Sequence, residues 1–302
     1  MVTLMRKIKK VIRQPGLVPD WIISPRYMPD RFFLKCQYRL RTGKRLNLDN
    51  PILFNEKIQW LKLYDRKPEY TIMADKYEVR KYIEQTIGKE YLIPLLGVWD
   101  RFEDISFEEL PDQFVLKSTH DSGGFVICQN KKSLDITKIR NFFEERLSKN
   151  FYYHAGEWVY KNIKPRMIAE KLMIDESSFE LKDYKIFCFN GEPKIVQVDF
   201  NRFIGHTVNL YSTQWEYLPL SHHLPTDPNA IISKPQKLDL MLDLARKLSA
   251  GKIHVRVDLH SIENKIYFGE LTFYNWAGYG RFDPPEWNRI FGDWMILPDL
   301  KN

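Results

Sequence analysis

The second half of the chain consists mainly of short apolar segments that follow one another through turns. Segments with strand character are 114–119, 125–129, 166–173, 183–191, 193–200, 206–212 and 253–273. Helical sequence interrupts them only at about 135–149 and 236–250. Parallel strands need a long crossover between neighbours, whereas antiparallel strands need only a tight turn. The pattern therefore predicts an α+β fold with antiparallel sheets, and it argues against a doubly wound parallel sheet.

The first half of the chain is predicted to be mostly helical. Residues 55–65 carry apolar side chains along one side, with Asn55 as the expected cap. A second helix is expected from Asp75 onward, because Asp75 and Glu78 have the spacing of a capping box. The segment 91–100 then has the sequence of a strand and a turn.

Residues 1–50 are basic and interrupted by prolines, and we expect an irregular arm with short helices. In residues 1–14, apolar side chains recur at helical spacing among lysines and arginines. Such a segment is either a helix that lies on an anionic membrane or a basic helix docked on its own domain. We predict three parts: this arm, a helical subdomain at 51–110 and a strand-rich domain at 111–302.

Composition narrows the partner class. The chain has 302 residues, 44% of them hydrophobic, which is enough for a large buried core. A formal net charge of +7 favours an anionic partner, which could be a nucleotide, an acidic sugar, a membrane surface or nucleic acid, and the charge does not choose among them. The sequence contains no recognisable motif for reading nucleic acid, so no nucleic-acid partner is expected.

Cysteine usage and hydropathy bear on location. The three cysteines, Cys36, Cys128 and Cys188, form no CxxC pair, which gives no support to a disulfide framework or a zinc site. No apolar run approaches the roughly 20 residues that a spanning helix needs, and the first residues lack the pattern of a signal peptide. The expected location is the cytoplasm, with contact at the inner face of the membrane left open.

The stretch FVLKSTHDSGGFVICQ, residues 114–129, places a lysine and two adjacent glycines between two strands. Glycines let backbone N–H groups approach phosphate oxygens, and Lys117 supplies a point charge. The segment is neither a Walker A loop nor a GxGxxG fingerprint. It is therefore either a flexible phosphate-covering loop or an ordinary hairpin turn.

Two carboxylates lie on consecutive strands near the C-terminus. Asp258 and Glu270 are flanked by apolar residues, so both would be costly to bury without neutralisation. A Mg²⁺ ion shared with phosphate oxygens would neutralise them. The alternatives are that they face solvent or that they pair with Arg256.

Between these motifs lie Glu170, Lys171 and Leu172 at the end of a strand, and Lys185 on the next strand. The backbone after such a strand can bind an adenine edge, and Lys185 could reach the same phosphates as Lys117. Each of these side chains could equally be a solvated charge on a sheet face.

The order of these motifs resembles the ATP-grasp superfamily. More narrowly, FNEKIQWLKLYDR, ADKYEVRKYI, YLIPLLGVW, DYKIFCFNGEP, VRVDL and IYFGELTF resemble the TupA-like ATP-grasp family of bacterial surface-polysaccharide gene clusters. The resemblance extends from about residue 30 to the C-terminus. It implies an ATP-grasp fold, in which two α+β subdomains grip ATP.

The resemblance also implies roles for individual residues. Those expected to bind ATP are Lys76, Lys117, Ser122, Gly123, Gly124, Glu170, Lys171, Leu172 and Lys185. Those expected to bind Mg²⁺ are Asp258, Glu270 and Thr272. The family's last metal motif is usually Glu-x-Asn, whereas Glu270 is followed by Leu271 and Thr272. The third ligand would then be Thr272, Asn275 or water, which puts a second metal in doubt.

The implied reaction joins a carboxylate to an amine through an acyl phosphate and releases ADP. The implied substrates are a uronic acid or acidic chain of polysaccharide biosynthesis and an amine. Lys117 and Lys185 would act on the phosphates. Arg202 is the expected carboxylate clamp, with His206 beside it, because a guanidinium matches a carboxylate in bidentate fashion. A structural ion pair is the alternative for Arg202.

Two other functions stay open. One is a phosphoryl- or glycosyltransferase on the same fold, and the other is a non-catalytic module that binds anionic glycan or tethers an assembly to the membrane. The presence of both lysines, the glycines and both carboxylates argues against the non-catalytic module. The reaction product separates a ligase from a transferase.

Overall fold

Two antiparallel sheets organise the protein in the computed structural model, which describes residues 24–174, 182–201 and 205–299. The smaller sheet has the order β1–β4–β2–β3, with strands Leu95–Trp99, Met167–Lys171, Phe114–Ser118 and Phe125–Cys128. The larger sheet has the order β11–β10–β5–β6–β7–β8, with strands Lys265–Thr272, His254–Ile262, Asp183–Phe189, Glu192–Phe200, Thr207–Ser212 and Tyr217–Leu218. The predicted α+β class with antiparallel sheets is confirmed.

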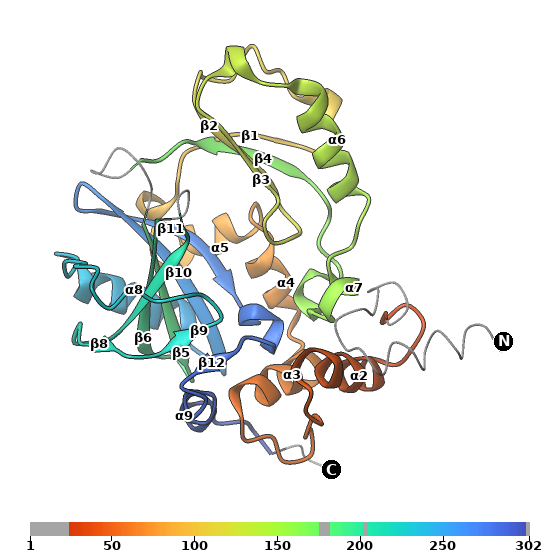
Figure 1. The fold of residues 1–302 in the computed structure, drawn as a ribbon. Helices are drawn as coiled ribbons and strands as arrows, with labels where there is room; N and C mark the ends of the chain where they lie inside the picture. The colour runs from red at the N-terminus through yellow and green to blue at the C-terminus, as the bar shows by residue number, and fades with distance from the viewer. Residues whose placement is uncertain (1–23, 175–181, 202–204, 300–302) are drawn as a thin grey trace.

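Helices pack beside both sheets, as Figure 1 shows. Their bounds are α2 Asp30–Thr42, α3 Phe54–Tyr64, α4 Pro68–Ala74, α5 Val79–Thr86, α6 Ile136–Leu147, α7 Tyr152–Ala155, α8 Leu238–Ser249 and α9 Trp287–Trp294. Helix α8 packs against β5, β6 and β10 of the larger sheet, and α6 packs against β2 of the smaller one. The short strands β9, Ser221–His222, and β12, Phe282–Asp283, form a separate pair.

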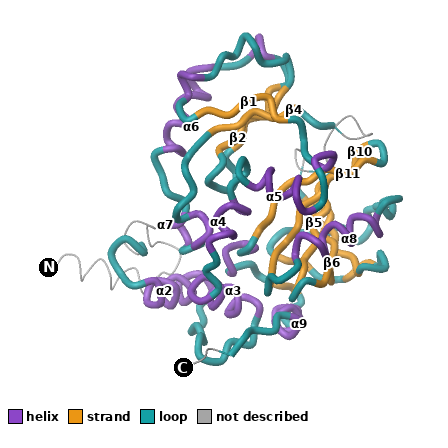
Figure 2. The backbone as a smooth tube through the Cα atoms, turned by 180° about the vertical axis from the view of Figure 1, so that it is seen from behind, coloured by secondary structure: helices purple, strands orange, loops and turns teal. Residues whose placement is uncertain are grey.

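The molecule has two hydrophobic cores. The larger core joins side chains of α2, α3, α4 and α5 to the larger sheet, α8 and α9. The smaller core lies between α6 and the smaller sheet, with Phe143 and Met167 fully buried. Figure 2 shows the smaller sheet set apart from the larger one, with the backbone of α4 and α5 near their junction. The domain boundaries predicted at residues 50 and 110 stay a prediction.

Two predicted helix starts need correction. Helix α3 begins at Phe54 after Leu53, and the Asn55 side chain does not cap it. Instead, Asn55 Nδ2 donates to the carbonyl oxygen of Gly280 at 2.8 Å, because the residue is buried against the C-terminal segment. The Asp75 carboxylate accepts hydrogen bonds from the backbone N–H groups of Tyr77 and Glu78, and these bonds form a turn before α5. That helix begins only at Val79.

The predicted hairpin at 253–273 is confirmed. Strands β10 and β11 are joined by Glu263 and Asn264, both with a left-handed backbone of φ 46° and 61°. This is the backbone that a two-residue turn of type I′ requires.

The predicted N-terminal arm is only partly described. Residues 30–42 form the 13-residue helix α2, which is more regular than the irregular arm that we predicted. Its apolar face, with Phe33, Leu34 and Tyr38, belongs to the larger core, and this burial stabilises the helix. The predicted membrane helix in residues 1–14 lies outside the described residues. Among the helices that the structure describes, none is long and apolar enough to cross a bilayer.

Candidate active site

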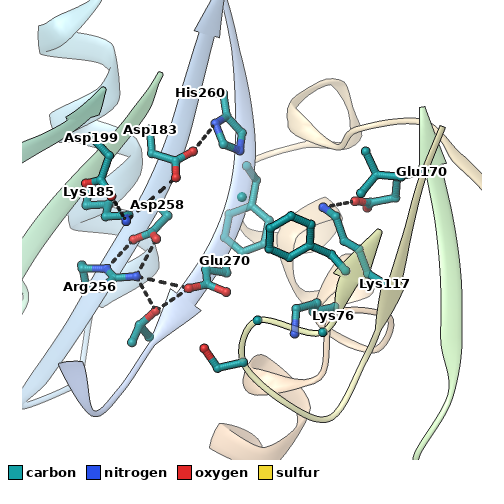
Figure 3. A pocket seen from close by; sticks show the side chains of 18 of the residues that line it. Lys76, Lys117, Glu170, Asp183, Lys185, Asp199, Arg256, Asp258, His260 and Glu270 are labelled. Atoms are coloured by element: carbon teal, nitrogen blue, oxygen red, sulfur yellow. Dashed lines mark hydrogen bonds and ion pairs between the residues drawn. The ribbon is translucent and has the colours of Figure 1, made fainter. Parts of the chain in front are cut away.

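A cleft of about 700 Å³ opens between the two sheets. The structure brings the sequence-predicted site residues together there, with the exception of Arg202, which lies outside the described residues. Those that line the cleft are Lys76, Lys117, Ser122, Gly123, Gly124, Glu170, Lys171, Leu172, Lys185, His206, Asp258, Glu270 and Thr272. Figure 3 shows Lys76 and Lys117 on one side and Lys185, Asp258 and Glu270 on the other. Their roles stay predictions.

The loop between β2 and β3 needs both of its glycines. Gly123 has a φ of +76°, a backbone conformation that side-chain-bearing residues rarely adopt. At Gly124 the backbone passes so close to Ser118 that an added Cβ would lie 1.8 Å from its hydroxyl oxygen. The N–H of Ser118 also donates to the carbonyl oxygen of Gly124 at 2.7 Å. The loop therefore folds tightly back on the end of β2.

Two cationic side chains hold this loop in place. The Arg146 guanidinium, from α6, forms an ion pair with the Asp121 carboxylate and donates to the carbonyl oxygen of Gly123 at 3.2 Å. The ammonium of Lys76 donates to the carbonyl oxygen of Asp121. Arg146 could not be predicted from the sequence, because an arginine near the end of an amphipathic helix carries no signal of its contacts.

Lys117 is anchored at the cleft wall by Glu170. The Lys117 ammonium lies 2.7 Å from one carboxylate oxygen, and Arg80 lies 2.9 Å from the other. Register explains the contact, because Lys117 pairs with Ile168 across β2 and β4, and Glu170 lies two positions from Ile168 on the same face of the sheet. The carboxylate of Glu170 is thus occupied by protein cations. If this segment binds adenine, the groups available are those of Lys171 and Leu172 that follow.

The opposite wall carries a network of ion pairs around Lys185. Its ammonium lies 2.5 Å from Asp199 and 3.9 Å from Asp183. His206 lies 2.9 Å from Asp199, and His260 lies 2.9 Å from Asp183. The two aspartates face each other across β5 and β6. The sequence contained a signal for this cluster, since Asp183 and Lys185 are two positions apart and share one face of a strand.

Arg256 lies between the two predicted metal ligands. Its guanidinium donates two hydrogen bonds of 2.7 Å to Asp258 and one of 3.2 Å to Glu270. It also donates to the hydroxyl of Thr272 at 3.0 Å. The structure thus shows the pairing with Arg256 that the sequence left open as an alternative. Within the described residues, no group of three or more His, Cys, Asp and Glu side chains could hold a metal.

The two carboxylates titrate differently. Burial raises the pKa of Asp258 to about 6, although Arg256 opposes the shift. Burial also acts to raise the pKa of Glu270, but Arg256 and Lys76 outweigh it, and the pKa is lowered. The pKa of Lys76 is itself lowered, because burial outweighs the attraction of Glu270. Opposite charges from both sides of the cleft therefore act on one another.

The family match decides the assignment. The model for TupA-like ATP-grasp proteins matches residues 56–296. The chain belongs to the TupA-like ATP-grasp family. The match includes both sheets and all of the described residues that line the cleft, with the exception of Arg41 on α2. The resemblance drawn from the sequence motifs is confirmed, and so is the fold.

Solved structures of ATP-grasp proteins are distant from this family member. A D-alanine–D-alanine ligase from Bacillus anthracis is 15% identical with a TM-score of 0.38, and the match covers 72% of this chain and 58% of that one. An RimK-domain ATP-grasp protein from Sphaerobacter thermophilus is 12% identical with a TM-score of 0.40, with coverages of 75% and 69%. No curated protein sequence matches the chain. The assignment therefore rests on the family match.

The ATP-grasp cleft extends past the predicted residues. Arg41 of α2, His154 of α7, Glu157 and Trp276 also line it. They lie in connecting segments or in the N-terminal helix, and none belongs to a motif from which the family was identified. They could not be predicted from the sequence, because only the packing of α2 and α7 beside the turn at 275–278 brings them to the cleft.

Proposed function

We propose that this protein is an ATP-dependent carboxylate–amine ligase that forms an acyl phosphate and releases ADP. The observation that carries the proposal is the charge arrangement of the cleft in an ATP-grasp chain. Lys76 and Lys117 stand with the glycine loop on one wall, and Lys185 stands with two carboxylates on the other. This arrangement suits a polyphosphate whose terminal group is transferred.

ATP fits the cleft by the chemistry of its lining. The apolar side chains of Val115, Phe125 and Ile127 line the part of the cleft that adjoins β2 and β3. An adenine ring would contact such a surface and bind the backbone near Leu172. The phosphates would extend toward Lys117 and the glycine loop.

Mg²⁺ fits the donor set. This ion binds one or two carboxylates together with substrate phosphates, so it does not need a complete protein cage. The Glu270 side chain is 42% exposed at the cleft, and Asp258 faces it on the neighbouring strand. These two residues would hold the ion, with Thr272 as the nearest hydroxyl. Asn275, the other side chain that the sequence offered as a ligand, also contacts Arg256. When bound, the ion would neutralise phosphate charge.

The protein's own groups account for both half-reactions. In the first, an oxygen of the substrate carboxylate bonds to the γ-phosphorus, and the bond to the β-γ bridging oxygen breaks to release ADP. Lys117 and Lys185 stabilise the negative charge that moves. In the second, the amine nitrogen bonds to the acyl carbon and phosphate leaves. The glycine loop would exclude water from the mixed anhydride. Arg202 remains our candidate clamp for the carboxylate, and His206 would assist beside it.

The substrate class that we propose is an acidic sugar, such as a uronic acid, or an acidic chain of polysaccharide biosynthesis, with an amine as co-substrate. The support is the motif resemblance and the net charge of +7. The setting that we propose is the cytoplasm, at the inner face of the membrane if residues 1–14 bind it. A phosphoryl- or glycosyltransferase and a non-catalytic glycan-binding or tethering module are the alternatives.

The experiment is a screen for ADP release. Purified protein is incubated with ATP and Mg²⁺ against a matrix of uronic acids and amines, with Lys185→Ala as the inactive control. The ligase predicts an amide together with ADP and phosphate, identified by mass spectrometry. A phosphorylated or glycosylated acceptor would establish the transferase instead. ATP binding without any product across the matrix would favour the non-catalytic module.

A further inference from the structure

The carboxylate of Glu157 is buried in the wall of the cleft. Glu157 is 7% exposed and comes directly before the short helix Trp158–Tyr160. The backbone on its N-terminal side is fixed, because Gly156 has a φ of +68° and packs on α2. A Cβ at Gly156 would lie 3.0 Å from Phe33 and 3.1 Å from Leu34. The position of Glu157 is therefore set by the docking of α7 on α2.

Within the described residues, no side chain or backbone group forms a hydrogen bond or ion pair with this carboxylate. The buried Lys62 acts on it through its charge, but the Lys62 ammonium donates to Gln59, Ala155 and Ala277, at 3.0, 2.8 and 2.8 Å. An ammonium has three N–H groups, and all three are used. A buried carboxylate without a hydrogen bond is costly. Its exposed edge opens on the cleft, so a ligand can supply the missing donor.

The turn Asn275–Gly278 lies between the surroundings of Glu157 and the carboxylates that we propose to hold Mg²⁺. The side chain of Asn275 accepts from Arg256, and the carbonyl oxygen of Ala277, two residues later, accepts from Lys62. The backbone between them is constrained, because Trp276 and Ala277 have φ of 49° and 50°. Glu270 is near enough for its charge to raise the pKa of Glu157. Glu157 therefore lines the same cleft as Arg256 and Glu270, and the turn after β11 contacts both Arg256 and Lys62.

We propose that Glu157 accepts a hydrogen bond from the amino group of the second substrate and takes its proton during the attack. The inference rests on the ligase function proposed above. The nitrogen lone pair forms the bond to the acyl carbon, the bond from that carbon to the phosphate oxygen breaks, and phosphate leaves with the electron pair. The proton released from nitrogen passes to a carboxylate oxygen of Glu157. Glu157 is then a catalytic residue of the second half-reaction only.

The surroundings of Glu157 suit this role. Burial raises its pKa to about 7, and the positive charges of Lys62 and Arg41 offset only part of the effect. The charged and titratable groups that interact electrostatically with Glu157 are Arg41 of α2, Lys62 of α3, Glu270 of β11, Tyr160 and Tyr274. A base is most effective when its pKa lies near the working pH.

The test compares amide formation with trapping of the acyl phosphate by hydroxylamine, which is largely unprotonated at neutral pH and needs no base. Glu157→Gln is expected to lower amide formation on the order of 10²-fold or more, while hydroxamate forms at close to the wild-type rate. The wild-type rate of amide formation should rise with pH through about 7, and this step should be absent in the variant. Glu103→Gln, in an exposed ion pair outside the residues that line the cleft, is the matched control.

The outcomes separate the two proposals. No hydroxamate from the wild-type protein, with any carboxylate of the screen, overturns the ligase and this inference with it. Normal hydroxamate and normal amide formation by Glu157→Gln leave the ligase intact and overturn the role of Glu157. Loss of both products in a variant with a native melting temperature also overturns it, because the residue would then act in the first half-reaction. If the variant does not fold, Glu157→Asp keeps the charge but shortens its reach, and an unchanged KM and kcat for the amine would refute the inference.

Discussion

Arg256 and Asp258 lie two positions apart on β10 and are joined by two hydrogen bonds of 2.7 Å. The Arg256 side chain is 11% exposed, so its charge depends on this carboxylate for neutralisation. Asparagine offers this guanidinium one oxygen in place of two, so Asp258→Asn would disturb the position of Arg256 as well as the chemistry. Glu270, which is more exposed, is the cleaner position at which to test the metal.

The pKa of Asp258 predicts acid sensitivity of Mg²⁺–ATP binding. As the pH falls through about 6, Asp258 gains a proton and can no longer balance Arg256 or hold Mg²⁺. At pH 5 about one site in ten keeps the charge, so the affinity for Mg²⁺–ATP should fall on the order of 10-fold from its value at pH 7.5. Calorimetric titration across this range measures it, and a flat profile would contradict the prediction.

The raised pKa of Asp258 affects the stability of the fold in the opposite direction from ligand binding. The folded-state pKa of about 6 lies above the ordinary value of 3.8, so protonation favours the folded chain. The stability that Asp258 contributes is fully present below pH 3.8 and is lost as the pH rises through about 6. Weakened binding at pH 5 should therefore not come from unfolding driven by this group, and a thermal melt at each pH provides the control.

Glu270→Gln should separate phosphoryl transfer from nucleotide binding. Glutamine keeps the shape of the side chain but removes the charge that would fix Mg²⁺ against the phosphates. Phosphoryl transfer depends on charge neutralisation in the transition state, so ADP release should fall on the order of 10²-fold or more. Nucleotide affinity should change less, because Lys117 and Lys185 contribute to it. Near-wild-type turnover in the folded variant would mean that the metal is held elsewhere.

The sequence predicted those parts of the fold and site that depend on local patterns. The β10–β11 hairpin followed from alternating apolar residues and from a turn at Glu263 and Asn264. The family motifs also picked out residues that the folded chain brings to one cleft, including Lys117 and Lys185. Local patterns were sufficient for the hairpin because its strands are consecutive in sequence, whereas the two lysines lie on different sheets and were identified through the family motifs.

Contacts between distant segments could not be predicted in this way. Asn55 looked like a helix cap, but it bonds to Gly280, which is 225 positions away. Arg146 reaches the glycine loop, and Glu157 reaches the cleft, only through the packing of α6 and α7. For Asp258 and Glu270 the sequence left open a metal ion or Arg256 as partner, and spacing alone could not decide which of the two cations the carboxylates contact.

Deletion of residues 1–14 should leave nucleotide affinity unchanged, because none of the residues expected to bind ATP lies in that segment. If the segment binds membranes, recovery of the protein on vesicles of anionic lipid should fall, by an amount that grows at low salt. Sedimentation with anionic and with neutral vesicles measures the effect. Equal recovery of the full-length and truncated chains on anionic vesicles would instead favour a helix docked on its own domain.

Gly124→Ala should disrupt the loop that we expect to cover the phosphates. The new Cβ would lie 1.8 Å from the Ser118 hydroxyl oxygen, so the loop must move away from the end of β2. We expect ATP affinity to fall on the order of 10-fold, which corresponds to about 1.4 kcal/mol. Gly251→Ala is the control, because Gly251 also has a positive φ but no atom lies within 4 Å of its Cβ position. Equal ATP affinity in the two variants would show that the loop does not contact the nucleotide.

Arg146→Ala tests whether the loop must be held from α6. The guanidinium pairs with Asp121 and donates to the carbonyl oxygen of Gly123, yet Arg146 itself does not line the cleft. Without Arg146 the free loop is less ordered, and ATP binding must supply the free energy that orders it. The KM for ATP should therefore rise several-fold, while kcat at saturating ATP changes little.

Arg146→Lys should restore only part of the effect, because one ammonium cannot reproduce the planar fork of contacts. Arg140 lies on the same helix and forms an exposed ion pair, so Arg140→Ala should leave the KM unchanged. An unchanged KM in Arg146→Ala would show that Lys76 and the hydrogen bond from Ser118 to Gly124 are sufficient to keep the loop in place.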